Sequence, residues 1–304
     1  MAERTGEIPW TVERRLEFID FRLLWEGQIR RKDITSAFGV SVPQASMDLS
    51  RYDDLAPGNL VYDSTRKTYV ASPSFEPRFP RVSADRLLLQ FRGIFNGMVE
   101  QRDTWIGALP DLGVVPEVRR SMDAKRLRSI LRAVRNRCEI DIHYQSFASE
   151  ETTWRTVTPH ALAFDGFRWH IRAWCTNTDL FKDFVIGRIL ELGEMREGNL
   201  DAAWDHEWSR DFTLRLAPNP RLSAPQKRAV ELDYGMTNGQ REINTKLALA
   251  FYLIKQLLLD LDESKLDPKR QQVVMTNKAD YEAERDRALA ASIDAIRAAK
   301  LATS

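Results

Sequence analysis

The sequence predicts an α+β protein with several domains, on three observations. Its 304 residues exceed the usual size of one compact domain. Residues 1–72 place helix-forming stretches around a glycine turn and end in two short β-prone runs. Residues 138–192 alternate polar with apolar side chains, and residues 193–304 mix strand and helix patterns. We therefore expect four parts, in which residues 73–137 form a helical linker.

Three helices are expected in the first part. Thr11 is a suitable cap for a helix that ends at Gly27, and a second helix fits residues 31–38. Ser41 can cap a third helix over residues 42–54. A helix, a glycine-containing turn and a second helix of this length form the helix-turn-helix pattern.

Residues 60–62 and 68–70 are β-prone runs joined by a basic tip, which predicts a hairpin that serves as a wing. In such a domain the third helix enters a major groove and the wing touches the DNA backbone. Asp48 on that helix is expected to repel phosphate. The alternative is a small helical domain whose hairpin only closes its core. Residues 1–72 contain ten Lys and Arg and eleven Asp and Glu, and this nearly neutral charge argues against DNA binding. The DNA-binding residues expected are Ser41, Gln44, Ser46, Arg51, Arg66 and Lys67.

The linker begins with three prolines in residues 72–80, which exclude a regular helix there. Ser83 can cap a helix that reaches about Glu100, and a further helix is expected from Pro116 to Asn136. Between Arg119 and Arg137 this stretch carries eight basic residues and one acid. Its cationic face is either solvated or in contact with DNA or with an acidic partner surface.

In the third part, residues 167–175 alternate cations with apolar side chains. A strand would send Arg168, His170 and Arg172 to one face and Trp169, Ile171 and Ala173 to the other. Neighbouring strands are expected around residues 140–144 and 182–188. The pattern predicts a small strand-rich module with a basic pocket.

The order and spacing of several motifs resemble WYL-domain transcriptional regulators over nearly the whole chain. This resemblance implies an N-terminal winged helix-turn-helix over 1–72, a WYL domain of Sm-like or SH3-like β-barrel type over 138–192 and a C-terminal α+β extension for dimerisation over 193–304. The family's Trp-Tyr-Leu motif reads Trp169-His170-Ile171 here. The other motifs that carry the resemblance are His143-Tyr144-Gln145-Ser146, Trp154-Arg155, Thr158-Pro159-His160, Lys182-Asp183-Phe184 and Gly187-Arg188-Ile189.

The chain is similar to the subgroup of these regulators found beside bacterial anti-phage defence operons. The resemblance implies a homodimeric repressor that binds an inverted-repeat operator and is released by a nucleotide or nucleic-acid effector. Guanidinium groups suit phosphates, and aromatic rings can stack on bases. The expected ligand-binding residues are Tyr144, Ser146, Arg155, His160, Arg168, His170, Arg172, Lys182 and Arg188.

Several alternatives stay open in this part. The basic residues are either a ligand pocket or a solvated barrel face, and strand parity does not decide whether Arg168 or Arg172 faces a ligand. Trp169 is expected in the core, and Arg188 has Asp183 and Glu191 as possible ion-pair partners.

Strand and helix patterns alternate in the last third. Strands are expected over Asp211–Leu216 and Gln240–Lys246, and helices after Ser223 and over Leu247–Leu261. A polar helix is expected over residues 280–300. This order resembles the extension of the same regulators, which lies against a partner subunit's WYL domain. The alternative is a self-contained α+β lobe.

No catalytic constellation is visible in the sequence. A glycine-rich phosphate loop, a nucleophile elbow and a paired-carboxylate signature are missing. The four histidines and the two cysteines, Cys138 and Cys175, lack metal-ligand spacing, so we expect no enzyme activity, metal or cofactor. The N-terminus has no apolar signal core and the longest apolar run is too short for a bilayer, which favours the cytoplasm. The rival functions are an RNA- or single-strand-binding protein that uses the barrel, and an enzyme acting on nucleotides.

Overall fold

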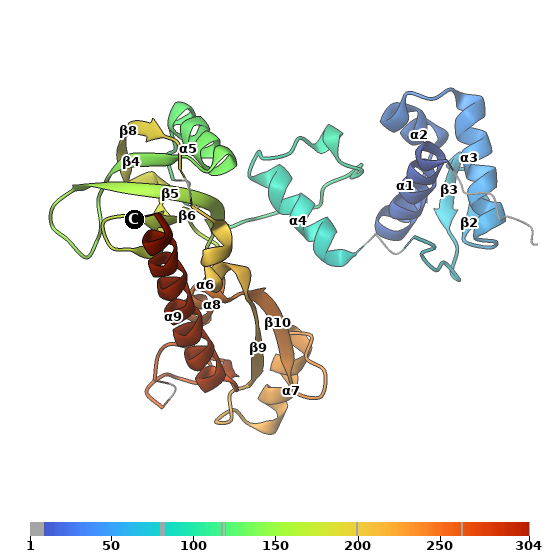
Figure 1. Cartoon of the computed structure of the whole chain (residues 1–304). Helices are drawn as coiled ribbons and strands as arrows, with labels where there is room; N and C mark the ends of the chain where they lie inside the picture. The colour runs from blue at the N-terminus through green and yellow to red at the C-terminus, as the bar shows by residue number, and fades with distance from the viewer. Residues whose placement is uncertain are drawn as a thin grey trace, which may run out of the picture. The chain divides into compact units, whose positions relative to one another are not determined.

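The computed structural model describes residues 9–79, 83–116, 118, 120–198, 200–262 and 264–303. The chain forms two compact units, Met1–Val118 and Arg119–Ser304, which Figure 1 draws in blue to teal and in green to red. Within the described ranges, none of the helices combines the length and the apolar character that crossing a bilayer requires.

Three helices form the body of the first unit: α1 (Trp10–Glu26), α2 (Arg31–Phe38) and α3 (Val42–Leu55). The predicted helix-turn-helix is therefore present. Gly39 ends α2 with a φ of 64°, a left-handed conformation that glycine adopts without strain. Ser41 caps α3 as expected, since its side chain accepts a hydrogen bond from the Gln44 N–H. The start of α1 differs from the prediction, because Pro9 and not Thr11 occupies the position before its first turn.

The wing is the predicted hairpin, with strands β2 (Leu60–Asp63) and β3 (Thr68–Ala71). A third strand, β1 (Gln28–Ile29), pairs with β3 and completes a sheet of order β1-β3-β2. Two residues are too few to carry a period-2 pattern, so β1 was not foreseen.

The proline-rich segment after the wing packs against the helices of the winged domain. Phe75 and Phe79 contact its hydrophobic core, and the Asp20 carboxylate accepts the backbone N–H groups of Arg78 and Phe79 at 3.1 and 3.0 Å. Further along, Leu87 of the next helix joins a small cluster that includes a residue of α1. The remaining helical elements are α4 (Ala84–Phe95), capped by Ser83 and shorter than expected, and η1 (Gln101–Asp103).

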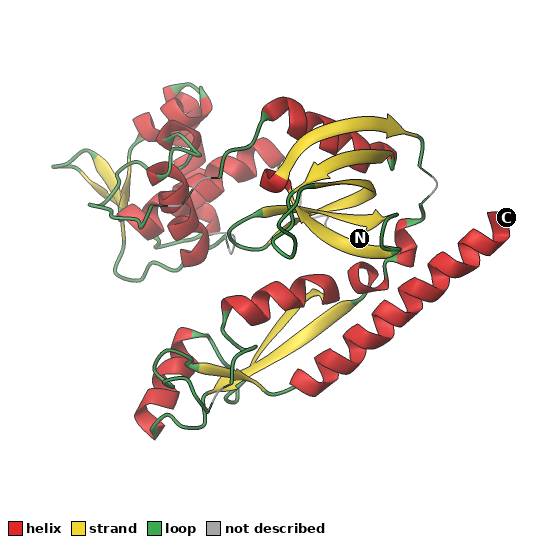
Figure 2. Ribbon diagram, turned by 90° about the vertical axis from the view of Figure 1, so that its left-hand side faces the viewer, coloured by secondary structure: helices red, strands yellow, loops and turns green. Residues whose placement is uncertain are grey.

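The second unit contains an open five-stranded antiparallel sheet of order β7-β6-β5-β4-β8. β7 and β8 are its two edges, and no pairing between them is recorded among the described residues. A closed barrel is therefore not seen. Figure 2 shows the sheet as a curved layer. Its strands are β4 (Glu139–Tyr144), β5 (Thr153–Phe164), β6 (Trp169–Cys175), β7 (Leu180–Val185) and β8 (Ile189–Arg196), with η2 (Ile186–Arg188) between the last two.

Helix α5 (Ala124–Asn136) covers the core of this sheet. It begins at Ala124 and not at Pro116, because the Asp123 side chain supplies the cap by accepting the Arg126 N–H at 2.7 Å. Ile130 and Ala133 of α5 pack against β-strand residues such as Ile140 and Ile171. One face of the sheet is thus closed by the apolar side of α5.

A smaller sheet of order β10-β9-β11 carries the C-terminal part. The long helix α9 connects the two sheets of the second unit: Tyr281 packs in the small sheet's core, and Ile296 packs with Phe181 of β7 (Figure 1). The elements are η3 (Ala202–Trp204), α6 (His206–Ser209), β9 (Asp211–Pro218), α7 (Ala224–Asp233), β10 (Arg241–Lys246), α8 (Leu247–Gln256), β11 (Val273–Met275) and α9 (Lys278–Thr303).

Candidate DNA interface and ligand site

The expected DNA-binding residues differ in how free their side chains are. Arg51 near the end of α3 and Lys67 at the wing tip are exposed, and no ion pair is recorded for either among the described residues. Arg66 is exposed beside Asp63, whose carboxylate is 3.8 Å from its Nε. Ser41 is exposed but already caps α3.

Gln44 and Ser46 are half-buried and held by neighbours. The Gln44 amide donates to Asp48 at 3.0 Å, and the Ser46 hydroxyl accepts from Arg31 at 2.8 Å. Arg31 also donates to the Tyr69 hydroxyl of β3 at 2.6 Å. These bonds fasten α3 to α2 and to the wing.

Asp48 was expected to repel phosphate, but its side chain does not face outward. It is 1% exposed and forms a bidentate pair with Arg15 of α1, at 2.6 and 3.1 Å. The guanidinium neutralises the carboxylate, which therefore offers no repulsion to a phosphate. The pair instead ties the recognition helix to α1.

Two exposed apolar side chains on α3 are not among the DNA-binding residues expected from the sequence. Val42, the first residue of α3, is 58% exposed, and Met47, on the side opposite the buried Ala45, Leu49 and Tyr52, is 65% exposed. Apolar side chains at this position of a recognition helix can contact thymine methyl groups. The helical period could have identified Met47, which falls on the side away from the apolar stripe.

In the second unit, Tyr144 lies at the end of β4 on the core face of the sheet. Its hydroxyl accepts the Val185 N–H at 3.2 Å, and its ring meets Phe184 edge-on. The Arg155 guanidinium lies 5.9 Å from the centre of the Tyr144 ring. The Arg155 Nε is buried and has no hydrogen-bond partner among the described residues.

A second arginine and a phenylalanine lie next to Tyr144. The Arg188 guanidinium is 3.6 Å from the centre of the Phe147 ring, which is 82% exposed. The Arg188 carbonyl accepts the Gln145 N–H, which holds it beside the end of β4. Among the described residues, no ion pair of Arg188 with Asp183 or Glu191 is seen. We call Tyr144, Phe147, Arg155 and Arg188 the Tyr144 cluster. The hydroxyl of Ser146, which lies next to Phe147 in the chain, accepts the Ala148 N–H at 3.2 Å.

The opposite face of the sheet holds Arg172, whose side chain is 5% exposed. Its guanidinium forms two hydrogen bonds with Asp205, at 2.7 and 2.9 Å, and one with Glu207 at 2.8 Å. Asp183 lies 3.6 Å away, and the His160 ring also contacts Asp205 at 3.0 Å. We call these five residues the Asp205 cluster.

Burial and ion pairing shift the pKa values in this cluster in opposite directions. Burial alone would raise the pKa of the Asp205 carboxyl, but hydrogen bonds from Arg172 and His160 outweigh it and lower the pKa to about 2. Burial would lower the pKa of Arg172, yet bonding to Asp205 and the charges of Asp183 and Glu207 raise it. Arg172 therefore stays charged, and neighbouring carboxylates already neutralise that charge.

His170, at the tyrosine position of the family motif, is also buried on this face. Its Nε2 lies 2.9 Å from Asp165, and its ring is 5.0 Å from that of Tyr252 on α8. Arg168 lies 3.5 Å from the same Asp165 carboxylate. Lys182 lines an open hollow of about 330 Å³ beside Arg172 and Tyr252. The nine expected ligand residues thus do not line one pocket but lie in separate places on the two sides of the sheet.

Trp169 was expected in the core but is 48% exposed beside Phe164. His143 stacks on Trp154, with ring centres 4.9 Å apart. Among the described residues, no group of three or more His, Cys, Asp or Glu side chains has the arrangement of a metal site.

Models of three protein families match the chain. The "BrxR transcriptional regulator winged helix-turn-helix domain" matches residues 11–93, the "WYL domain" matches 125–193, and the "BrxR transcriptional regulator, C-terminal dimerization domain" matches 211–281.

The chain is also similar to proteins named "DNA-binding transcriptional repressor CapW". The Stenotrophomonas maltophilia protein is 38% identical over 90% of this chain and 92% of its own length. The proteins of Escherichia coli and Pseudomonas aeruginosa are each 36% identical, over 88% of this chain and 90% of theirs. This chain belongs to the CapW family of transcriptional repressors.

The resemblance to WYL-domain regulators is therefore confirmed, and so are the winged helix and the WYL domain as parts of the fold. In this CapW-family protein, the residues that match the dimerization domain form the small sheet and the start of α9. Asp205 and Glu207, which neutralise Arg172, lie between the WYL and dimerization matches and were not singled out from the sequence. They follow Arg172 by more than thirty residues, so no local spacing could have linked them.

Proposed function

We propose that this CapW-family chain is a homodimeric repressor that holds an inverted-repeat operator with its two winged domains. A nucleotide or nucleic-acid ligand bound at the WYL domain releases it, and the regulated genes form a phage-defence operon. The observation that carries the DNA-binding part is an α3 held by the Arg15–Asp48 pair beside a wing with an exposed cationic tip.

The ligand part rests on the Tyr144 cluster. It offers an unbonded buried donor on Arg155, a guanidinium on Arg188 and the exposed Phe147 ring. Such groups suit a phosphate and an adjoining base. The Asp205 cluster is a weaker candidate, because an anionic ligand would have to displace carboxylates already bonded to Arg172.

Release requires a ligand that prefers one arrangement of the dimer over another. A ligand with equal affinity for the DNA-bound and free forms would shift nothing, however tightly it bound. We infer that the ligand changes the spacing or orientation of the two recognition helices.

The first test compares three probes in gel shifts: a duplex with the inverted repeat upstream of the neighbouring genes, a scrambled duplex, and a single strand of equal length. We expect preference for the repeat duplex. Preference for the single strand would favour the second candidate, an RNA- or single-strand-binding protein that uses the exposed Phe147 and Trp154.

The second test removes two exposed cations from the winged domain. We expect Arg51→Ala with Lys67→Ala to weaken operator binding and to lower the slope of log affinity against log salt by about 1–2, since each phosphate contact contributes about 0.9. Arg78→Ala with Arg102→Ala removes the same charge from exposed positions in the same unit and serves as the control. An unchanged salt slope in the first pair would contradict the assigned interface.

A further inference from the structure

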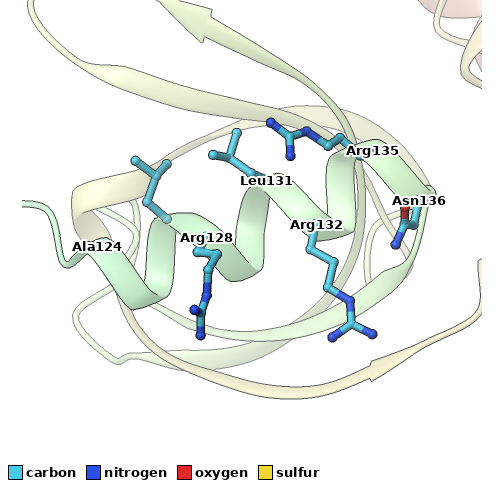
Figure 3. Close-up of a pocket in the computed structure, with 7 residues that line it drawn as sticks. Ala124, Arg128, Leu131, Arg132, Arg135 and Asn136 are labelled. Carbon is cyan, nitrogen blue, oxygen red and sulfur yellow. The ribbon is translucent and has the colours of Figure 1, made fainter.

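Helix α5 has one face without any assigned role. Leu127, Ile130 and Ala133 pack into the core of the five-stranded sheet, whereas Arg128, Arg132 and Arg135 are exposed. Figure 3 shows Arg128 and Arg132 extending from one side of the helix, with Leu131 and Arg135 on the other. A shallow hollow of about 370 Å³ lies along these side chains and has Leu127 and Leu131 in its lining.

The charge of this face is uncompensated. Among the described residues, no carboxylate or hydrogen-bond acceptor is recorded for Arg128, Arg132 or Arg135. No acidic residue occurs between Ala124 and Cys138. The nearest acids along the chain are Asp123, which is bonded to the Arg126 N–H at the start of the helix, and Glu139, which pairs with Arg196.

Arg128, Arg132 and Arg135 occupy positions i, i+4 and i+7 of α5, so their backbone positions share one side of the helix. Four residues of α-helix rise about 6 Å, so Arg128 and Arg132 can reach adjacent phosphates of one nucleic-acid strand. Arg135 lies almost one further turn along. An apolar strip beside the cations suits the sugar edge of a backbone, and guanidinium groups bind phosphate through paired donors.

The winged unit gives a reason for such a second contact. Its first 72 residues hold ten basic against eleven acidic residues, and Arg14, Arg15, Arg22 and Arg66 each lie within ion-pair distance of a carboxylate. DNA affinity at physiological salt depends strongly on the number of phosphates that cations neutralise. In the described part of the winged domain, the exposed cations without an ion pair are Arg30, Lys32, Arg51 and Lys67, so a further basic face would add to the number of phosphates neutralised.

We propose that the Arg128–Arg132–Arg135 face of α5 binds the phosphate backbone of the duplex that carries the operator. This inference rests on the proposed repressor function and adds to it a sequence-independent contact from the WYL side of the chain. Because it involves phosphates only, it raises affinity for the operator and for unrelated duplexes alike.

The test uses full-length protein with Arg128, Arg132 and Arg135 all changed to Gln, and a second variant with all three changed to Lys. Binding is measured against salt on a long duplex, a duplex trimmed to the inverted repeat, and a single strand. We expect the Gln variant to lose about tenfold or more in affinity for the long duplex and to lower the salt slope by about 2–3. The Lys variant keeps the slope, because it retains the charges.

Lys227→Gln with Arg228→Gln and Lys269→Gln is the matched control, since it removes three charges from surface positions of the same unit. A slope unchanged in the Gln variant, an equal loss in the control, or a loss on the single strand alone would each overturn the inference. An acidic protein partner at α5 would also leave the duplex slope unchanged. If the wild-type protein does not bind the operator, the proposed function itself fails, which is a different result from a Gln variant that binds like the wild type.

Discussion

Arg172 illustrates how a buried charge is accommodated by residues far along the chain. A guanidinium that is 5% exposed is costly unless its donors are satisfied. Asp205 provides two acceptors and Glu207 a third, while Tyr252 donates to Asp183 beside them at 2.8 Å. This network fastens the outer face of β6 to the segment that precedes the C-terminal sheet.

We expect Asp205→Asn to lower the free energy of unfolding at pH 7 by about 3 kcal/mol, because Arg172 loses its bidentate partner. The folded pKa of Asp205, about 2, lies below the ordinary 3.8. Its ionised form therefore contributes stability that is complete above about pH 4 and is lost as the pH falls through 2.

Urea unfolding at pH 7 and pH 3 would measure this. The difference between wild type and variant should shrink at pH 3, because this carboxyl takes up a proton in the unfolded chain at that pH but stays mostly ionised in the folded protein. Asp294→Asn, on an exposed side chain of α9, is the control. A gap of equal size at both pH values would contradict the assignment to Asp205.

At the scale of elements, α3 depends on α1 for its placement. The Arg15–Asp48 pair is almost fully buried and joins the middle of both helices. Sequence patterns correctly predicted α2 and the Ser41 cap, because local propensity and capping determine both. They misplaced Asp48, because an acid is ordinarily solvated and its partner lies 33 residues away.

Asp48→Asn should destabilise the winged unit by about 3 kcal/mol, since it leaves the Arg15 guanidinium buried without its counter-ion. Combining Arg15→Met with Asp48→Leu should recover much of the loss, because an apolar pair avoids the desolvation cost. Thermal unfolding compares the two, with the exposed Asp54→Asn on the same helix as the control. A single variant as stable as wild type would show that the pair has no structural role.

At the scale of the whole molecule, the proposed function assigns operator binding to the winged domains and its control to a ligand at the WYL domain. The Tyr144 cluster lies on the core face of the five-stranded sheet, beneath which α5 packs. A ligand there would act on the element that carries the exposed arginine face. The proposed ligand site and the proposed phosphate-binding face therefore both involve α5.

We expect Arg155→Gln and Arg188→Ala to repress a reporter as well as the wild type but to fail in release. Each change removes a group that we propose binds phosphate, and leaves the winged domain untouched. Gel shifts on the repeat duplex, with nucleoside phosphates and short oligonucleotides as competitors, would measure both properties. Arg297→Gln, on an exposed arginine of α9, is the control. Normal release in both variants would remove the Tyr144 cluster from the proposal.

The sequence by itself determined the winged helix, most helix ends and the alternation of β6, because capping, glycine turns and strand period act within a few residues. It also indicated the family, through motifs spread over the chain. Only the tertiary structure decided which cations are free. Arg172 and Arg15 are neutralised by acids more than thirty residues away, whereas Arg128, Arg132 and Arg135 have no recorded partner among the described residues. A cation's availability depends on the carboxylates that folding brings beside it, and local pattern does not contain that information.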